Sequence, residues 1–406
     1  MTTITSAYEL ELATLDTTGL DRRAALESAM SIAHQSWLAR TDVGFAAMHY
    51  DDAISILRDK RFHNALANLR DAVPDTQSGY FENRRQSILG MEGEDHLRLR
   101  RLVSPAFTPA AADRHRATMR EVFTNLLEPA LAAGRCDFMV EVADPYPIPV
   151  ICEVLGAPSS DAPLFSQWAT DIFRIFNGNL AEDLPLIERA STQLSTYVRA
   201  MVEQRRHSPG PDLLSDLIAA EEAGDRLEND ELVMLAEAVL MAGTDTTRNQ
   251  LGCAMALFAE HPDQWAALVA DRSLANRAVE ETMRYLGAVR ATVRIASEDI
   301  VYRDVLFPKG TIVTTHLAAA NRDSDVFEDP GTFDITAVRA TQQMTFGSGI
   351  HRCLGAALAR AELQEALSVL AERVASVRSD GPVTWKPATF GIWGPASLPL
   401  VLEPAT

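Results

Sequence analysis

The sequence predicts a mainly α-helical protein with small β-sheets. An apolar run with helical spacing extends from about Asp230 to Glu260, and an amphipathic run covers Ser273 to Leu286. Strand-like segments are short, namely Ile300-Val-Tyr302 and Thr311-Ile-Val-Thr314, and the Phe307-Pro-Lys-Gly310 turn between them favours a hairpin. Further helices are expected over most of residues 22–60, 95–133, 160–205, 211–222, 262–286 and 354–376, so helices outweigh the sheet.

Composition and charge restrict the class of protein. The 406 residues are 47% hydrophobic, which supplies an ample core, and no Gly/Ser-rich linker, low-complexity tract or internal repeat marks a boundary. Lys and Arg number 37 against 56 Asp and Glu, and the net charge of −19 disfavours nonspecific binding to nucleic acid or to an anionic membrane. The N-terminus has no basic start followed by an apolar core, and no stretch approaches about 18 uninterrupted apolar residues, so no membrane anchor is expected.

The four cysteines, Cys136, Cys152, Cys253 and Cys353, show no Cys-x-x-Cys spacing and no small secreted framework. Zinc binding by these cysteines is therefore disfavoured. Reduced thiols and a cytoplasmic location are expected.

The first polar motif is Asp95-His-Leu-Arg-Leu-Arg-Arg101. His96 and Arg100 are four residues apart and so share one face of a helix, whereas Arg98 and Arg101 point elsewhere. Two cationic donors on one face suit a pair of carboxylates. A solvated basic stripe is the alternative.

The long apolar helix contains an irregular segment, Ala242-Gly-Thr-Asp-Thr-Thr247. A glycine there costs about 1 kcal/mol relative to alanine, and the hydroxyls that follow compete for backbone hydrogen bonds and leave space in the groove. The alternative is a simple kink in a core helix. Asn229 or Asp230 can cap the start of this helix, and Pro262 marks its end.

Glu281-Thr-Met-Arg284 lies within the amphipathic run, and its acid and base, three residues apart, share one face. Taken alone, such a pair is most simply a solvated surface ion pair.

The most informative segment is Phe346-Gly-Ser-Gly-Ile-His-Arg-Cys-Leu-Gly355, which precedes a helix-forming run that starts at Leu354. The first amides of a helix lack intrahelical partners and carry the positive end of its dipole, so a thiolate at Cys353 would be stabilised there. The glycines let the backbone approach the sulfur or a flat ligand, His351 and Arg352 supply cations, and Phe346 supplies an aromatic wall. This arrangement fits thiolate ligation of haem iron, and the alternative is a buried, inert cysteine.

This loop resembles that of the cytochrome P450 family, which reads Phe-x-x-Gly-x-x-x-Cys-x-Gly and is matched at Phe346, Gly349, Cys353 and Gly355. The earlier motifs resemble the family's propionate-binding, distal-helix and Glu-x-x-Arg segments. Residues 318–323 and 327–335 resemble the segment leading into its meander. The resemblance runs from about residue 90 to the C-terminus. It implies a single domain over residues 1–406 of the soluble bacterial type, with haem between a long distal helix and the cysteine-loop helix.

The resemblance also implies residue roles. Cys353 would bind the iron of haem b (iron protoporphyrin IX), and the other residues expected to bind this cofactor are His96, Arg100, Ala242, Gly243, Arg294, Phe346, His351 and Gly355. Asp245 and Thr246 would pass protons to dioxygen. Glu281 and Arg284 would form a structural lock, in which Ala337 replaces the arginine that often completes it and Arg339 is a candidate substitute.

The substrate contacts of this family come from variable segments. Here those segments offer an apolar set that favours a small apolar organic substrate, together with one arginine that could anchor a carboxylate: Phe81, Ile88, Phe173, Phe176, Val289, Trp393 and Arg290. Ala288 stands where members of the family often carry proline.

The resemblance implies a haem-thiolate monooxygenase that inserts one oxygen atom from O2 into its substrate by hydroxylation or epoxidation. The chain has no flavin- or nicotinamide-binding appendage, so electrons would come from a separate ferredoxin with its reductase, or from a flavodoxin. Their expected docking side carries Arg98, Arg101, Arg352 and Arg360. Two alternatives stay open, a peroxide-driven peroxygenase and a non-catalytic haem-based gas sensor or carrier.

Overall fold

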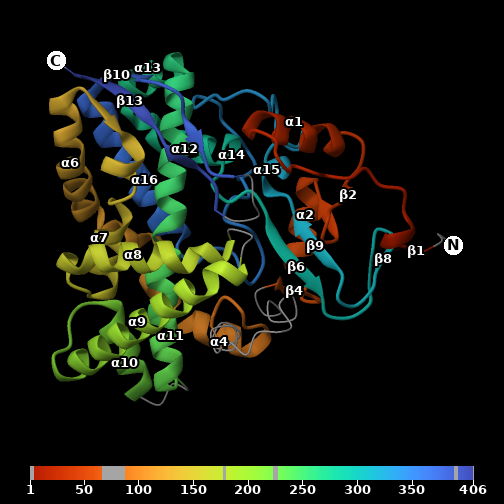
Figure 1. Ribbon diagram of the computed structural model, residues 1–406, viewed down its shortest axis with the longest axis horizontal. Coiled ribbons are helices and arrows are strands. Elements are labelled where there is room, and N and C mark those ends of the chain that lie inside the picture. The colour runs from red at the N-terminus through yellow and green to blue at the C-terminus, as the bar shows by residue number, and fades with distance from the viewer. Residues whose placement is uncertain (1–3, 66–86, 177–179, 223–226, 388–391, 406) are drawn as a thin grey trace. The chain divides into compact units, whose positions relative to one another are not determined.

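The computed structural model describes residues 4–65, 87–176, 180–222, 227–387 and 392–405 (Figure 1). The chain divides into two compact units, each assembled from segments that are distant in sequence. The first comprises Met1–Leu97, Val289–Thr332 and Arg339–Cys353. The second comprises Arg98–Ala288, Phe333–Val338 and Leu354–Thr406. The single domain expected over residues 1–406 stays a prediction.

The first unit is built on a five-stranded sheet with the order β2-β3-β9-β6-β4. β3 and β9 pair in parallel, and the other neighbours are antiparallel. The strands are β2 (Leu38–Arg40), β3 (Phe45–Ala47), β4 (Phe62–Asn64), β6 (Thr292–Ala296) and β9 (Ile312–Thr315). The helices of this unit are α1 (Arg22–Ala33), α2 (Tyr50–Arg58) and α15 (Leu317–Ala320), and α4 (Gly93–Val103) begins in it.

The helix expected over most of residues 22–60 is wrong in its middle, where β2 and β3 form instead. Phe45 and Ala47 belong to one hydrophobic cluster, while Ala46 belongs to another with Ala29 and Met48. Both faces of β3 are therefore buried, and a strand covered on both faces loses the apolar–polar alternation that would have revealed it.

The expected hairpin is also wrong. β7 (Ile300–Tyr302) pairs with β8 (Val305–Phe307), and β1 (Thr5–Ser6) adds to β8 in parallel. The turn is Arg303-Asp304, and both residues have positive φ, 47° and 61°. Two such residues match the right-handed twist of paired strands, so the chain turns there and carries the Thr311 segment into β9 of the larger sheet.

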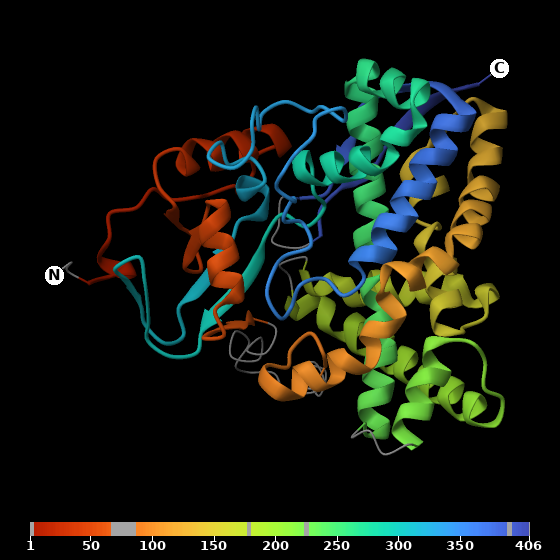
Figure 2. The same cartoon turned by 180° about the vertical axis from the view of Figure 1, so that it is seen from behind.

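The second unit is mainly helical, as predicted. Figures 1 and 2 both show α12 and α16 side by side among the other helices of this unit. Its helices are α5 (Pro109–Arg114), α6 (Arg116–Ala133), α7 (Pro147–Leu155), α8 (Ala162–Phe173), α9 (Leu180–His207), α10 (Leu213–Glu222), α11 (Asn229–Ala242), α12 (Asp245–Glu260), α13 (Pro262–Ala270), α14 (Ala275–Tyr285) and α16 (Ala356–Arg373). Its strands are β5 (Arg135–Asp137), β10 (Val374–Ser379), β11 (Thr384–Trp385), β12 (Pro395–Ser397) and β13 (Pro399–Pro404). None of the described helices is both long enough and apolar enough to cross a membrane.

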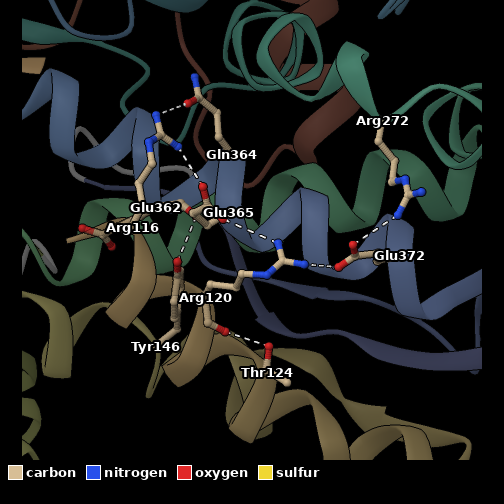
Figure 3. Close-up of polar contacts among 9 residues, drawn as sticks. All are labelled: Arg116, Arg120, Thr124, Tyr146, Arg272, Glu362, Gln364, Glu365 and Glu372. Atoms are coloured by element: carbon tan, nitrogen blue, oxygen red, sulfur yellow. Dashed lines mark hydrogen bonds and ion pairs between the residues drawn. The ribbon is translucent and has the colours of Figure 1, made fainter. Parts of the chain in front are cut away.

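Ion pairs tie α16 to α6 (Figure 3). Arg116 lies 3.0 Å from Glu365 and donates to Gln364 at 2.8 Å, while Arg120 pairs with both Glu365 and Glu372. Each pair is partly exposed and contributes less than about 1 kcal/mol, but together they orient the helix that begins just after Cys353.

Candidate functional site

Cys353 is the exposed member of the four cysteines, whereas Cys136, Cys152 and Cys253 are buried. Its amide donates to the Phe346 carbonyl at 2.9 Å, and this bond closes the loop. Helix α16 begins at Ala356 with Gly355 as its N-cap, two residues later than predicted. Burial raises the pKa values of the Cys136 and Cys152 thiols to about 12, so these two stay protonated. Cys353 is thus the exposed cysteine, whereas the other three are buried.

Glycine gives the cysteine loop its shape. Gly347 and Gly349 have φ angles of 67° and 73°, in the left-handed region that favours glycine. A Cβ added at Gly349 would lie 2.1 Å from the carbonyl oxygen of Leu57, near the end of α2. Arg58 of the same helix donates to the hydroxyl of Ser348 at 3.0 Å. The loop therefore rests directly on the C-terminal turn of α2.

Two of the predicted propionate-binding residues lie together in the first unit. The rings of His96 and His351 have centroids 4.3 Å apart, and His351 Nε2 lies 3.0 Å from Glu92 Oε1. Burial opposes ionisation of Glu92, yet hydrogen bonds from His351 and from the Asn64 amide hold its pKa below the ordinary value. Glu92 is a site neighbour that the sequence did not reveal, since its partner lies 259 positions away.

Arg294, on β6, has a donor set that fits an absent anionic group. Its side chain is buried, at 4% exposed, and donates to the Thr292 hydroxyl and the Val293 carbonyl, both neutral. Among the described residues, no carboxylate lies within ion-pair distance of it. Burial lowers its pKa to about 10, against the opposing charge of Glu92. A buried guanidinium with neutral partners favours a bound carboxylate, and a haem propionate supplies one.

The helical run predicted over about 230–260 is present as two consecutive helices, α11 and α12, and the interruption at Gly243 and Thr244 lies within the segment predicted to be irregular. The Thr244 hydroxyl donates to the Met241 carbonyl at 3.0 Å, and the Thr246 hydroxyl donates to the Ala242 carbonyl at 3.1 Å. These bonds show the predicted competition between side chains and backbone.

The caps of this helix pair were predicted in part. The N-cap is Glu228, which forms a capping box with Glu231, so neither Asn229 nor Asp230 caps the helix. The end is as predicted, since α12 stops at Glu260 and Pro262 begins α13.

The interruption leaves one side of the helix pair open. Ala242 is exposed and Gly243 and Thr246 are half-buried, whereas Met241 and Asp245 beside them are buried. Gly243 packs against Ile151 of α7, where a Cβ would come within 3.2 Å of Ile151. Ala242 and Thr246, one predicted to bind the cofactor and the other to relay protons, are four residues apart and share the open side of this otherwise buried helix pair.

Asp245, the predicted proton carrier, is held by two cations. Its side chain is 6% exposed, and its Oδ1 accepts from Arg248 Nε at 2.7 Å and lies 3.7 Å from Lys386 Nζ. Arg248 also lies 3.8 Å from Asp144, whose pKa is raised by burial. Arg248 follows Asp245 by three residues, so helical spacing could have revealed it, whereas Lys386 comes from a distant segment.

Glu281 and Arg284 form a buried ion pair. Arg284 Nε and Nη2 each donate to the carboxylate at 2.8 Å, and Glu281 also accepts from the Asp334 amide at 3.1 Å. The pair is thus a buried contact and not a solvated surface pair. Arg339 donates to the Glu328 carbonyl at 2.8 Å, and its part in the lock stays a prediction.

The remaining predicted residues are spread over both units. Arg100 is half-buried on α4, and its carbonyl accepts from Ser104. Phe81 and the side chain of Phe176 lie outside the described residues. Ile88, Phe173, Val289 and Arg290 are half-buried, and Trp393 is 2% exposed and stacks on Trp385 with centroids 4.6 Å apart.

The expected docking arginines divide into two kinds. Arg98 forms a bidentate pair with Glu231, and Arg360 forms one with Glu280. Arg101 and Arg352 have exposed side chains.

Comparison with known proteins shows which family this chain resembles. The sequence profile of the family described as Cytochrome P450 matches residues 161–373. Luteothin monooxygenase of Streptomyces thioluteus is 35% identical over 368 residues, covering 90% of each chain. The mycinamicin IV hydroxylase/epoxidase of Micromonospora griseorubida is 35% identical over 358 residues, covering 87% of this chain and 88% of that one. The crystal structure of CalO2 superposes with a TM-score of 0.91 at 29% identity, covering 97% of this chain and 100% of that one.

The fold and the cysteine loop therefore define a haem-thiolate protein, and the chain belongs to the cytochrome P450 family. It is a monooxygenase that inserts one oxygen atom from O2 into an organic substrate, with haem as its cofactor and electrons from a redox partner.

Proposed function

We propose that this chain uses haem b, takes its electrons from a ferredoxin, and oxidises a small apolar organic molecule by hydroxylation or epoxidation. The observation that carries the proposal is the exposed Cys353, placed in a glycine-shaped loop directly before α16. The other three cysteines are buried. Free, buried thiols also support a cytoplasmic location.

The cofactor would be held by residues from several elements. Cys353 would bind the iron, Arg294 and His351 would bind propionates together with His96 and Arg100, and Ala242, Gly243, Phe346 and Gly355 would contact the macrocycle. When bound, the haem supplies the one-electron chemistry by which O2 is activated. Glu92 keeps the ring of His351 oriented through their 3.0 Å contact.

Thr246 and Asp245 would move the protons. Thr246 donates its own proton to the Ala242 carbonyl, which leaves the lone pairs of Oγ1 on the open side of the helix pair able to accept. Asp245 lies beside Thr246 on α12 and pairs with Lys386, whose side chain is 32% exposed. The Asp245 carboxylate can therefore exchange protons with solvent by way of Lys386. The side chains of Arg248 and Lys386 keep the carboxylate in place between these two sides.

The redox partner is inferred from arginine side chains, and the substrate is inferred from apolar side chains. Because the side chains of Arg101 and Arg352 are exposed, we infer that these arginines meet an acidic ferredoxin. The apolar side chains of the variable segments favour an apolar substrate. If that substrate carries a carboxylate, Arg290 would bind it. The relatives named above are a luteothin monooxygenase and a mycinamicin IV hydroxylase/epoxidase, which supports hydroxylation or epoxidation of an organic molecule.

The absorption spectrum of the dithionite-reduced protein under carbon monoxide tests the cofactor assignment. A strongly red-shifted Soret band is expected for thiolate ligation, and Cys353→Ser should abolish it. A histidine-like band in the unsubstituted protein would contradict the role of Cys353.

Thr246→Ala tests the proton relay. We expect oxygen consumption to continue while the fraction of it coupled to product falls by about 10-fold or more, because general acid catalysis typically contributes about 100- to 10,000-fold. The measurement is product formed per O2 consumed. Thr244→Ala is the matched control, since it removes a nearby hydroxyl that is buried and bonded to Met241. Unchanged coupling in Thr246→Ala would remove Thr246 from the relay.

A further inference from the structure

We propose that Gln250 is a positioning residue that fixes the wall of the substrate pocket next to Thr246, through the backbone of residues 286–288. This inference rests on the proposed function, because it concerns the pocket of the same site. It assigns a role to a buried amide that none of the predicted motifs includes.

Gln250 lies on α12, about one helical turn after Thr246. Thr246 and Gln250 are four residues apart in one helix and therefore share a face. Thr246 is half-buried on the open side of the helix pair, whereas Gln250 is only 4% exposed. The face of the helix that is open at Thr246 is therefore covered by other residues one turn later, at Gln250.

The residues that close it are those directly after α14. Gln250 Oε1 accepts from the Ala288 amide at 2.8 Å, and its Nε2 donates to the Leu286 carbonyl at 3.3 Å. One side-chain amide therefore satisfies a donor and an acceptor of the same three-residue segment. Because Gly287 lies between them and can adopt many backbone conformations, these two bonds decide where the segment runs.

The same segment also holds the C-terminal turn. The Ala288 carbonyl accepts from the Trp393 amide at 2.8 Å, and the indole of Trp393 donates to the Lys386 carbonyl at 2.9 Å. Ala288 and Trp393 are each 2% exposed, so this chain of hydrogen bonds lies in the interior. Gln250 thereby positions two segments that the family resemblance implies to contact the substrate.

Residue chemistry explains why an amide is needed. A proline at position 288 would fix φ but would offer no N–H donor. Ala288 restricts its backbone little and leaves a buried N–H that needs a partner. Gln250 accepts the hydrogen bond from that N–H, and this bond restricts the backbone at Ala288.

Gln250→Met tests the proposal, because it keeps the length of the side chain and removes both hydrogen bonds. The holoenzyme is titrated with imidazole and with 4-phenylimidazole, and binding is followed by absorption. We expect the affinity for 4-phenylimidazole to change by about fivefold or more and that for imidazole by less than about twofold, since only the larger ligand reaches the wall. Amide exchange at Ala288 should also accelerate by about 10-fold or more.

Gln264→Met is the matched control. The Gln264 side chain also accepts from a backbone amide, that of Ile335 at 3.0 Å, but on α13 and away from Thr246. It should leave the ratio of the two affinities unchanged. Gln250→Glu serves as a second variant should Gln250→Met fold poorly, since its carboxyl oxygen can still accept from Ala288 and should keep that amide protected.

The possible results distinguish a failure of the proposed haem site from a failure of the role proposed for Gln250. No spectral response to either azole would contradict the proposed haem site, while Ala288 exchange would still report on the hydrogen bonds. Faster exchange with an unchanged affinity ratio would make Gln250 purely structural and overturn the positioning role. Unchanged exchange would overturn the hydrogen-bonding argument itself.

Discussion

At the scale of single residues, exposure and charge separate functional groups from structural ones of the same type. Four cysteines share one chemistry, but Cys353 is exposed whereas Cys136, Cys152 and Cys253 are buried. Three arginines show the same principle, since Arg284 is paired with Glu281, Arg248 with Asp245, and Arg294 has only neutral partners in the described chain. Arg294 is the one of the three whose surroundings favour an added anion.

Cysteine reactivity provides a test at this scale. At pH 8 a thiol with a pKa of about 12 is ionised in about one molecule in ten thousand, so Cys136 and Cys152 should react very slowly with iodoacetamide. Removal of haem should make Cys353 the fastest-reacting thiol, as read by mass spectrometry of the alkylated protein. Cys353→Ser is the control and should lose the fast phase. Rapid alkylation of Cys136 in the folded protein would contradict the burial described above.

At the scale of elements, helices position the site through their ends and interruptions. The C-terminal turn of α2 supports the cysteine loop, the N-terminus of α16 follows it, and the gap between α11 and α12 opens the side that carries Thr246. At the gap, the hydroxyls of Thr244 and Thr246 donate to backbone carbonyls of the preceding turn.

Gly349→Ala tests the contact between the cysteine loop and α2. A Cβ at this position meets the Leu57 carbonyl at 2.1 Å and the backbone has a φ of 73°, so the loop must move. We expect a loss of stability well above the roughly 1–2 kcal/mol of left-handed backbone strain alone, together with a smaller red-shifted Soret band. Gly310→Ala is the matched control, because its φ is 86° but nothing lies within 4 Å of the added Cβ. Equal losses in the two variants, measured by chemical denaturation, would argue against the contact.

At the scale of the whole molecule, buried acids make the stability depend on pH in opposite directions. Burial raises the pKa of Glu362 on α16 well above its ordinary value, and its Oε2 has no hydrogen-bond partner in the described chain. The Tyr146 hydroxyl donates to the backbone carbonyl of Glu362 at 2.9 Å (Figure 3). Glu92 has a lowered pKa, so its contribution is present above its unfolded pKa and is lost as the pH falls.

Glu362→Gln should therefore stabilise the protein increasingly as the pH rises. The raised folded pKa means that the stability associated with Glu362 is complete below its unfolded pKa and declines as the pH rises toward the folded pKa, by up to about 1.4 kcal/mol per pH unit. The difference in unfolding midpoint between variant and parent should be small near pH 4.5 and positive at pH 8. Glu365→Gln is the control of opposite sign, since it loses ion pairs with Arg116 and Arg120. A pH-independent difference for Glu362→Gln would contradict a buried neutral acid.

Much of the site was predictable because it consists of short motifs whose spacing is local. The glycines and Cys353 of the loop, the acid and base of the Glu281 pair, and the irregular turn around Thr246 can each be recognised within about ten residues. The partners of those motifs were not predictable. Lys386 is distant in sequence from Asp245, Glu92 from His351, and Gln250 from Ala288, and helical or strand periodicity carries no information about such pairs.

The sequence by itself determined the class of this protein and its mainly helical character, and it predicted the residues proposed to carry its chemistry, because those depend on local spacing and residue type. The tertiary structure alone decided that β3 is a strand buried on both faces, that the Arg303-Asp304 turn makes the hairpin, and that Gln250 holds the segment after α14. The physical reason is that burial and buried hydrogen bonds are satisfied between segments far apart in the chain. Only the folded arrangement selects which of many chemically equivalent partners meet.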